Sequence, residues 1–497
     1  MTIFKQLINK ISNKTQKIMK KKYTLLIIIG ISLLIFTPAI ITKQYNMALF
    51  GIMILWIYNI VFGLCKFEKR FIFLLMNVMI FTFILDRPLI SALSGKVWWY
   101  FSEIAVCKAL IAIYVTEIFL LLGYFVTEIV EKKYNMKNKT IEIKNDKIVK
   151  YVLLGIFVIS GIISFYVEIT KFINMKNLDY ALIYTAKMKE FPLIIRTITS
   201  IFPYVVFAYL ATLPNKKNSI IVLLVYIIIA IPSFLLGGRN ALILRIIFSI
   251  VYILIRNFNE KGNNIWIHKQ TKIIFGISIP IIVMFLGAYN YIRDDQNVEN
   301  KSPIYLITDF FYKQGTTFDT ICEGFEYEDT LKRKNNVDSY TFGDIIDYAK
   351  HSTISQKLFH TESLGAGNSI TMVEKSNSMA HRLSYLVLGE ESYLAGHGRG
   401  TSYIIETYMD AGMLGIAIYS FIIGMYLSLV IYLVSNCNYL LKYIGLATLA
   451  QLFILPRYSA SGFISFIVTF QFWSIVILVY LIKFIMNKIE GRNNENP

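Results

Sequence analysis

The sequence predicts an all-α polytopic membrane protein with about twelve transmembrane helices and one large loop subdomain. Of the 497 residues, 56% are hydrophobic and the mean hydropathy is +0.55, above what ordinary soluble domains show. Apolar runs of spanning length recur along the chain, and a single polar insert at 292–403 interrupts them. A loop of that length between spans commonly carries function rather than serving as a connector.

Each predicted span is an apolar run of roughly 20 residues, the length that crosses a hydrocarbon core as a helix. The predicted spans are 24–41, 46–65, 70–86, 105–129, 150–169, 192–213, 218–236, 239–257, 271–291, 404–434, 438–456 and 461–486. Short amphipathic helices are expected inside the insert at 304–311, 354–359 and 379–388.

Basic residues collect in alternate loops, as they do in loops that stay in the cytoplasm. This pattern places both termini in the cytoplasm and the insert outside it. The expected parts are a basic N-terminal segment at 1–22, a bundle at 23–291, an extracytoplasmic loop subdomain at 292–403, a second part of the bundle at 404–486 and a cytoplasmic tail at 487–497. We expect the first span to stay uncleaved, because no small-x-small cleavage site follows it.

Composition excludes several classes of function. The formal net charge is +18, but the lysines lie mainly in short loops between spans, where they act as topology signals rather than as a nucleic-acid-binding face. The four cysteines are scattered, and the five histidines show no HxxxH or HxH spacing, which argues against disulfide and zinc sites. We therefore expect no nucleic acid, no metal and no cofactor.

Arginines lie at the expected outer mouths of several spans, against the charge rule for external loops. They are Arg87, Arg196, Arg239, Arg245, Arg293, Arg399 and Arg457. A guanidinium inside a span is costly unless it faces a wet or anionic cavity, and its fork suits diphosphate oxygens. The arginines expected to bind a diphosphate together in one pocket are Arg196, Arg239, Arg245, Arg399 and Arg457. Internal salt bridges, or snorkelling to the lipid headgroups, are the alternative interpretation.

Three residues near the end of the insert are candidates for a catalytic base. His397 lies between glycines, and a neutral imidazole accepts a proton near pH 7. Glu406 and Asp410 are spaced i, i+4 at the start of a span, so their like charges repel and one of them is expected to hold a proton or to face an arginine. A solvated loop histidine, and carboxylates that only stabilise a helix N-terminus, are the alternatives.

Two stretches resemble the bacterial O-antigen and capsule repeat-unit polymerases, the Wzy-type family. The run Leu-Gly-Gly-Arg-Asn-Ala-Leu at 236–242 is similar to the family's small-Gly-x-Arg turn between spans. The second stretch runs from Gly398 through Glu406 to Gly415, and the overall plan of spans with one late external loop is similar as well. Related O-antigen ligases often show His-Asn before the final helical segment, where this chain has Thr401-Ser402, which argues against a ligase.

The resemblance implies a GT-C-like membrane glycosyltransferase of the bacterial inner membrane that builds a surface polysaccharide such as the O-antigen of lipopolysaccharide or a capsule. It implies undecaprenyl-diphosphate-linked oligosaccharide as substrate, membrane lipids as surroundings and a chain-length-regulating co-polymerase as partner. The arginines would then stabilise the diphosphate in place of a metal. A lipid-linked oligosaccharide flippase or other transporter, an O-antigen ligase, and a non-catalytic scaffold are the alternatives.

Overall fold

The computed structural model of the chain describes residues 24–133, 146–178, 191–259, 266–267, 281–289, 291, 301–333, 336–365 and 367–495. Within them the chain is helical and has no strand, so the predicted all-α class is confirmed. Nine helical segments of this described part are long and apolar enough to cross a membrane, as expected of a multi-pass membrane protein. They are Tyr45–Cys65, Phe67–Leu93, Glu103–Glu131, Lys147–Met175, Leu193–Ala211, Lys216–Leu235, Arg239–Asn259, Tyr403–Asn436 and Phe470–Ile489.

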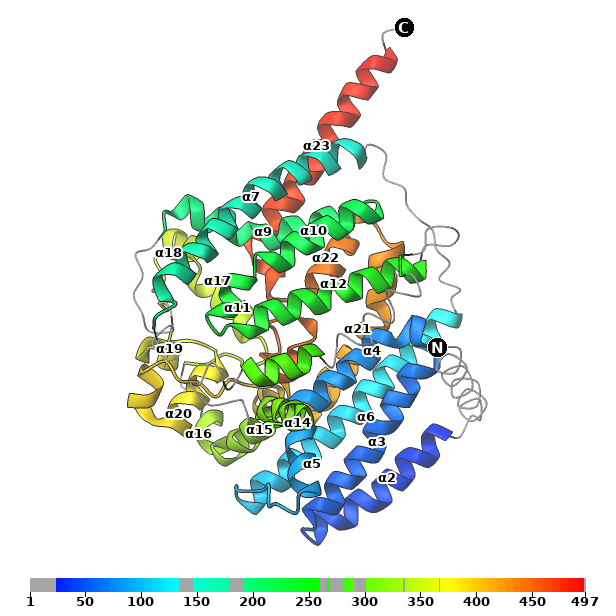
Figure 1. Ribbon diagram of the computed structural model, residues 1–497, viewed down its shortest axis with the longest axis vertical. Helices are drawn as coiled ribbons and strands as arrows, with labels where there is room; N and C mark the ends of the chain where they lie inside the picture. Colours follow the sequence, from blue (N-terminus) through cyan, green and yellow to red (C-terminus); the bar gives the residue numbers. More distant parts are fainter. Residues whose placement is uncertain are drawn as a thin grey trace.

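The first half of the bundle packs around the long helix α6. Its elements are α2 (Thr24–Ile41), α3 (Tyr45–Cys65), α4 (Phe67–Ile80), the π-helical η1 (Phe81–Leu85), α5 (Asp86–Leu93) and α6 (Glu103–Lys133). Helix α3 lies against α2, α4 and α6 (Figure 1). The rings of Phe62, Phe73 and Tyr124 meet edge to face or tilted between α3, α4 and α6, which is a favourable geometry for buried aromatic pairs.

The second half of the bundle packs around α9. Its elements are α7 (Asp146–Met175), α9 (Leu193–Ala211), α10 (Lys216–Ile228), α11 (Ile231–Leu235), α12 (Arg239–Asn259), α22 (Tyr439–Leu452) and α23 (Phe470–Glu495). Helix α9 contacts α7, α22 and α23. These contacts bring helices from the middle of the sequence against helices near its C-terminus.

Helix α21 (Tyr403–Asn436) crosses α6 at very close range and joins the two halves. A Cβ at Gly123 would lie 2.0 Å from the Phe421 carbonyl oxygen, and one at Gly424 would lie 2.1 Å from the Leu120 carbonyl oxygen. Only glycine permits this approach on both helices. The crossing therefore fixes the position of α21, which carries Glu406 and Asp410 in its first turns.

Helix α21 is broken near its start, at Ala411 and Gly412. Gly412 has φ 63° and ψ −156°, a conformation that residues with a Cβ rarely adopt. The predicted span at 404–434 is therefore a short N-terminal segment followed by a long membrane helix. The break separates the first segment, which continues from the insert, from the long membrane helix.

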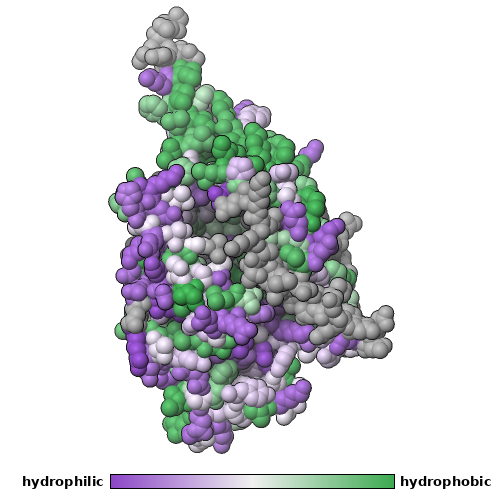
Figure 2. All heavy atoms as spheres, turned by 90° about the vertical axis from the view of Figure 1, so that its left-hand side faces the viewer, coloured by the Kyte–Doolittle hydropathy of each residue, from purple (hydrophilic) through white to green (hydrophobic). Residues whose placement is uncertain are grey.

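The described part of the insert, residues 301–402, forms a helical subdomain that we call the insert subdomain. Its helices are α14 (Pro303–Gln314), α15 (Thr317–Glu326), α16 (Glu328–Lys332), α17 (Gly343–His351), α18 (Thr353–Phe359), α19 (Ile370–Lys375) and α20 (Met379–Leu394). The short helices predicted within 304–311, 354–359 and 379–388 are confirmed as parts of α14, α18 and α20. The subdomain lies along one end of the bundle, at the left in Figure 1. Figure 2 shows that this face is largely hydrophilic and hollowed, with a hydrophobic surface above it at α23.

The last two predicted spans differ from the prediction. Residues 438–456 form the short helix α22 followed by the 3-10 turn η2 (Leu455–Arg457). The helix predicted to begin at residue 461 begins at Phe470, and residues 461–469 form turns and the 3-10 segment η3 (Ser465–Val468). Prediction of a continuous helix was wrong here because apolar composition does not distinguish a helix from a buried irregular segment. Most of the predicted span 271–291 lies outside the described residues, so the total of about twelve stays a prediction.

Candidate functional site

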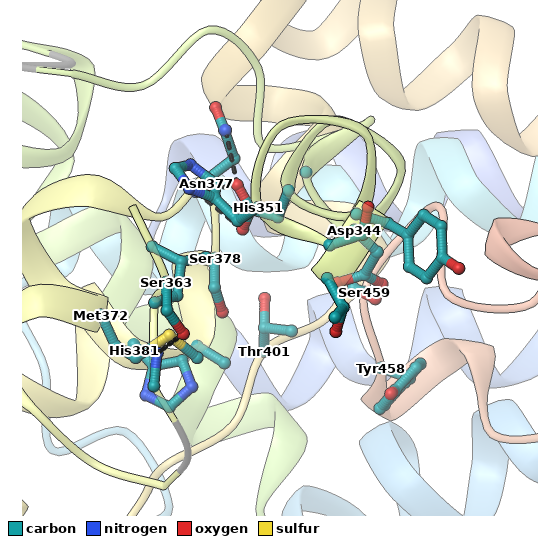
Figure 3. Close-up of a pocket in the computed structure, with 18 of the residues that line it drawn as sticks. Asp344, His351, Ser363, Met372, Asn377, Ser378, His381, Thr401, Tyr458 and Ser459 are labelled. Carbon is teal, nitrogen blue, oxygen red and sulfur yellow. Dashed lines mark hydrogen bonds between the residues drawn. The ribbon is translucent and has the colours of Figure 1, made fainter. Parts of the chain in front are cut away.

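A pocket of about 870 Å³ lies between the insert subdomain and the bundle. Helices α17, α18 and α20 form one side, and the starts of α9, α21 and α23 with the segment 457–459 form the other. Its titratable carboxylate, imidazole and guanidinium groups are Asp344, Asp347, His351, His381, Glu406 and Arg457. In Figure 3, Thr401 lies between His381 on one side and Ser459 with Asp344 on the other. The pocket thus gathers charged groups from distant parts of the sequence, which is typical of ligand sites.

Glu406 is the most deeply buried carboxylate of this pocket. It is 1% exposed, and its side chain accepts hydrogen bonds from the Thr401 hydroxyl at 2.9 Å and from the Ala460 backbone N–H at 2.7 Å. Ser402 caps the helix that carries it by accepting from the Ile404 N–H. The two bonds hold the carboxylate in one orientation and still leave it acceptor capacity toward the pocket.

Asp344 is a second carboxylate of the pocket, half-buried, and the turn at 459–461 holds it. The Ser459 hydroxyl donates to it, and its backbone N–H donates to the Ser461 hydroxyl at 3.3 Å. Burial raises the pKa of Asp344 above its usual range, and the bond from Ser459 offsets part of that rise. Because Asp344 and Glu406 also lie within electrostatic reach of each other, the pair favours a state in which one carboxyl holds a proton.

Two histidines from the insert subdomain line the same pocket. The His351 Nδ1 donates to the Glu362 carbonyl at 2.8 Å, and the His381 Nδ1 lies 2.7 Å from the Tyr393 hydroxyl. That hydroxyl donates to the Ser369 carbonyl, so its oxygen accepts from His381 and leaves Nε2 as the acceptor nitrogen. Burial lowers the pKa of His381, which therefore remains neutral near pH 7.

Arg457 is the guanidinium of this pocket. It ends the 3-10 turn η2, its Nη1 donates to the Gln314 Oε1 at 3.2 Å, and its guanidinium carbon lies 5.9 Å from the centre of the Phe83 ring. The electrostatic influence of Arg457 also reaches Asp86 on α5. The residue is thus held by contacts from the first bundle half and the insert while it lines the cavity.

A second charged cluster, the α15 ion-pair network, consists of Arg87, Asp319, Glu323 and Arg399. The Arg399 Nη2 lies 2.8 Å from the Glu323 Oε1, and the Arg87 Nη1 lies 3.4 Å from the Asp319 Oδ2. Burial raises the pKa of Glu323 to about 7, against the opposing effect of Arg399. Burial likewise raises the pKa of Asp319. In this cluster each guanidinium faces a carboxylate of the protein itself.

The structure does not bring the five predicted arginines together in one pocket. Among the described residues, Arg457 lines the pocket and the other four do not. Arg245 donates to the Tyr226 carbonyl at 2.7 Å and stacks over that ring, and Arg399 pairs with Glu323. Arg239 begins α12, and the exposed Arg196 lies on α9 beside the pocket residue Thr197. The roles predicted for these four stay predictions.

Of the three predicted catalytic residues, the pocket contains Glu406. His397 is exposed and lies outside the pocket lining of the described residues, and its carbonyl accepts from the Asn368 amide at 2.8 Å. Asp410 accepts from the Ser339 hydroxyl at 2.6 Å and from the Thr341 N–H at 2.8 Å, so it fixes the chain that leads into α17. Glu406 and Asp410 therefore lie in two different structural settings, the first in the pocket and the second against the 339–341 chain.

Sequence reasoning missed Asp344 and Asp347, which reach the pocket from α17. Both Asp347 carboxylate oxygens accept from the Asn377 backbone N–H, at 2.9 and 3.0 Å, and Oδ1 also accepts from its side-chain amide at 2.7 Å. Their i, i+3 spacing on a short polar helix was the one signal available, and such spacing is common on solvated helices. It shows nothing of the distant 459–461 turn that completes the Asp344 site.

Comparison with known proteins places the chain in a family. A model of the family described as O-antigen polysaccharide polymerase Wzy matches residues 18–490, which is nearly the whole chain. Neither the comparison with curated proteins nor the comparison with solved structures gave a match. The match spans both bundle halves, the insert subdomain and every residue of the pocket. The chain therefore belongs to the Wzy family of O-antigen polysaccharide polymerases.

Proposed function

We propose that this protein polymerises undecaprenyl-diphosphate-linked oligosaccharide repeat units into an O-antigen or capsule polysaccharide at the outer face of the bacterial inner membrane. The family membership supports polymerisation in general. The observation that carries the proposal is one pocket in which the buried carboxylate of Glu406 and the guanidinium of Arg457 both line a cavity large enough for sugar residues. The insert subdomain then lies outside the cytoplasm, and both termini lie inside it.

The proposed reaction is a single displacement at the anomeric carbon of the growing glycan. The acceptor hydroxyl at the non-reducing end of the incoming unit loses its proton to a carboxylate as its oxygen forms the new bond to that carbon. The bond from the anomeric carbon to the diphosphate oxygen breaks, undecaprenyl diphosphate leaves with the electron pair, and the configuration inverts. A GT-C-like enzyme of this kind uses no cofactor.

Glu406 is the base in this proposal, and the neighbouring Asp344 carboxyl interacts with it electrostatically. Its carboxylate lines the pocket and is oriented by Thr401 and Ala460, whereas His397 lies outside the pocket and Asp410 is bonded to the 339–341 chain. A base must lie within hydrogen-bond reach of the hydroxyl that it deprotonates. Geometry therefore ranks Glu406 above the other two candidates.

Arg457 stabilises the diphosphate leaving group in this proposal. A fixed guanidinium in a site that excludes water stabilises developing negative charge far better than an exposed one. Arg457 is the arginine that lines the pocket, which places a cationic side chain where this role requires one. Arg196, beside the pocket on α9, is the next candidate.

The test incubates the purified protein in nanodiscs with synthetic undecaprenyl-diphosphate-linked repeat units and separates the products by size. Wild type gives a ladder of products, with or without a chelator, and Arg457→Ala and Glu406→Gln give a strongly reduced ladder. A single addition to one acceptor would instead indicate a ligase, and movement of lipid across the bilayer without products would indicate a transporter. Absence of a ladder from folded wild-type protein contradicts the proposal. A co-polymerase partner is expected to change the length of the ladder rather than its existence.

A further inference from the structure

One side of the pocket mouth is apolar, although the interior carries charged groups. Leu193 of α9, Ile354 of α18 and Phe470 of α23 all line the pocket, yet they are 56%, 46% and 52% exposed. A residue that both lines a cavity and faces outward marks its edge. Three large apolar side chains from three separate elements therefore form one edge of the opening.

Hydrogen bonds hold these three elements in place around the opening. The Phe470 backbone N–H donates to the Tyr348 hydroxyl at 3.1 Å, which ties α23 to α17. The Gln471 side chain donates to the Ser200 hydroxyl at 3.3 Å, which ties α23 to α9. Helix α18 follows α17 directly and packs against it. The apolar edge is thus part of a fixed frame rather than a chance exposure of one loop.

Two polar side chains of α18 bond back into the subdomain, whereas its large apolar side chains are exposed beside the exposed Thr353 and Lys357. Its Ser355 hydroxyl donates to the Ala349 carbonyl at 2.6 Å, and its Gln356 amide donates to the His351 carbonyl at 2.7 Å, both back into the subdomain. Ile354 and Leu358, one helical turn apart, are exposed, and Phe359 next to them is exposed as well. A short helix with this division is suited to lie at a membrane interface with its apolar face toward hydrocarbon.

The apolar surface continues from the pocket edge toward the membrane-spanning part of the molecule. Ile194, exposed next to Leu193, begins α9, and both α9 and α23 contain membrane-length apolar segments. We call the exposed large apolar residues of these three elements at and next to the pocket lining the apolar rim; they are Leu193, Ile194, Ile354, Leu358, Phe359 and Phe470. Exposed apolar patches of this kind mark contacts with lipid or with another molecule.

We propose that the apolar rim is where the hydrocarbon chain of the lipid-linked substrate leaves the pocket, between α9, α18 and α23, while its diphosphate and sugars occupy the polar interior. This inference rests on the proposed function. The substrate is a polar group covalently joined to a long hydrocarbon chain, so a pocket that holds the first needs a continuous apolar exit for the second. The rim provides apolar side chains at the pocket edge, which keep the hydrocarbon chain out of contact with water as it leaves the pocket.

Photo-crosslinking in the full-length protein tests the route directly. Benzoylphenylalanine replaces Leu358 in one variant and Leu394, an exposed residue of α20 outside the pocket lining, in a matched control. Both proteins are placed in nanodiscs with a tagged undecaprenyl-diphosphate glycolipid and irradiated. The Leu358 variant is expected to crosslink the glycolipid at least about tenfold more than the control, and excess untagged glycolipid removes the signal.

Other products of the same experiment overturn the inference. Crosslinks from position 358 to bulk phospholipid alone, to a second copy of the chain or to another protein assign the rim to a different occupant. Crosslinking needs no turnover, so its result does not depend on whether the protein polymerises the substrate. A product ladder with no glycolipid crosslink rejects the route and leaves the polymerase, whereas a competed crosslink without any ladder keeps the route and rejects polymerisation.

A charged substitution gives a second readout. Leu358→Glu places a carboxylate in the hydrocarbon exit and is expected to raise KM at least about tenfold for the full-length undecaprenyl substrate. It should leave KM within about twofold for a soluble analogue with a short isoprenoid tail, which does not extend over the rim. Equal effects on both substrates contradict the inference.

Discussion

The pocket and the α15 ion-pair network each contain at least one arginine and a buried carboxylate, but they use these groups differently. In the network, Arg399 meets Glu323 and Arg87 meets Asp319 within salt-bridge distance. In the pocket, Glu406 and Asp344 bond to hydroxyl and backbone N–H groups, and they face a cavity of about 870 Å³ together with Arg457. The difference teaches that buried charge alone does not mark a site, because the adjacent volume decides whether a ligand can use it.

The largest expected effect separates the two carboxylates at the start of α21. Glu406→Gln should lower the polymerisation turnover about 100-fold to 10,000-fold, because it removes the proposed base while it preserves the shape of the side chain. Asp410→Asn should lower turnover far less, because Asp410 bonds to the 339–341 chain. The measurement is single-turnover product formation, with circular dichroism to verify that both variants are folded. Equal losses in the two variants would contradict this assignment of the base.

Disruption of the network should affect stability rather than chemistry. Arg399→Ala leaves the 5% exposed Glu323 without its cation and should lower the free energy of unfolding by about 1–3 kcal/mol. The exposed pair Lys350 and Asp338 is the matched control, and Lys350→Ala should cost less than about 1 kcal/mol. Thermal unfolding in detergent measures both. The double variant Arg399→Ala/Glu323→Ala should lose less than the sum of its single variants.

The pH dependence of stability should identify Glu323 within the network. Burial raises the pKa of Glu323 to about 7, above its ordinary value of 4.5. Between about pH 4.5 and about pH 7, the folded protein therefore keeps a proton on Glu323 that the unfolded chain has released. The contribution of Glu323 thus makes the free energy of unfolding fall as the pH rises through this range, by at most about 1.4 kcal/mol per pH unit. Glu323→Gln should flatten that slope in melting curves recorded across this range. An unchanged slope would mean that Glu323 ionises normally.

The smallest effect is expected at His397. Its side chain is exposed, so His397→Ala should change turnover less than about twofold and stability by less than about 0.5 kcal/mol. His381→Gln is the variant for comparison, because His381 lines the pocket and has a neutral imidazole with one acceptor nitrogen. A 100-fold loss from His397→Ala in the ladder assay would restore His397 as the candidate base.

The sequence was sufficient to predict the class of the fold and part of the site. Apolar runs of spanning length predict membrane helices directly, and α3, α6, α7 and α9 follow that rule. It could not predict the break at Gly412 or the irregular 461–469 segment, because apolar composition does not distinguish a continuous helix from a broken helix or a buried irregular segment. The irregular segment lies between the pocket residues Ser459 and Phe470, and the turn just before it directs the Ala460 backbone N–H to Glu406.

Among the site residues, Glu406 could be predicted because a carboxylate at the start of a span is unusual by composition alone. Asp344 could not, since its partner Ser459 lies 115 residues away and no local pattern connects them. The position of Arg245 outside the pocket could not be predicted either, for a different reason. A guanidinium within a span needs partners for its N–H donors. For Arg245 these partners are the carbonyl and the ring of Tyr226, and only the packing of α10 against α12 reveals them.

The most direct test of the central claim compares binding of undecaprenyl-diphosphate glycolipid to Arg457→Ala and Arg399→Ala protein in nanodiscs. If the pocket is the site, the Kd should rise about tenfold or more for Arg457→Ala, equivalent to about 1.4 kcal/mol, and should stay within about twofold for Arg399→Ala. The opposite order, with Arg399→Ala abolishing binding and Arg457→Ala leaving it unchanged, would contradict the account and place the diphosphate in the network instead.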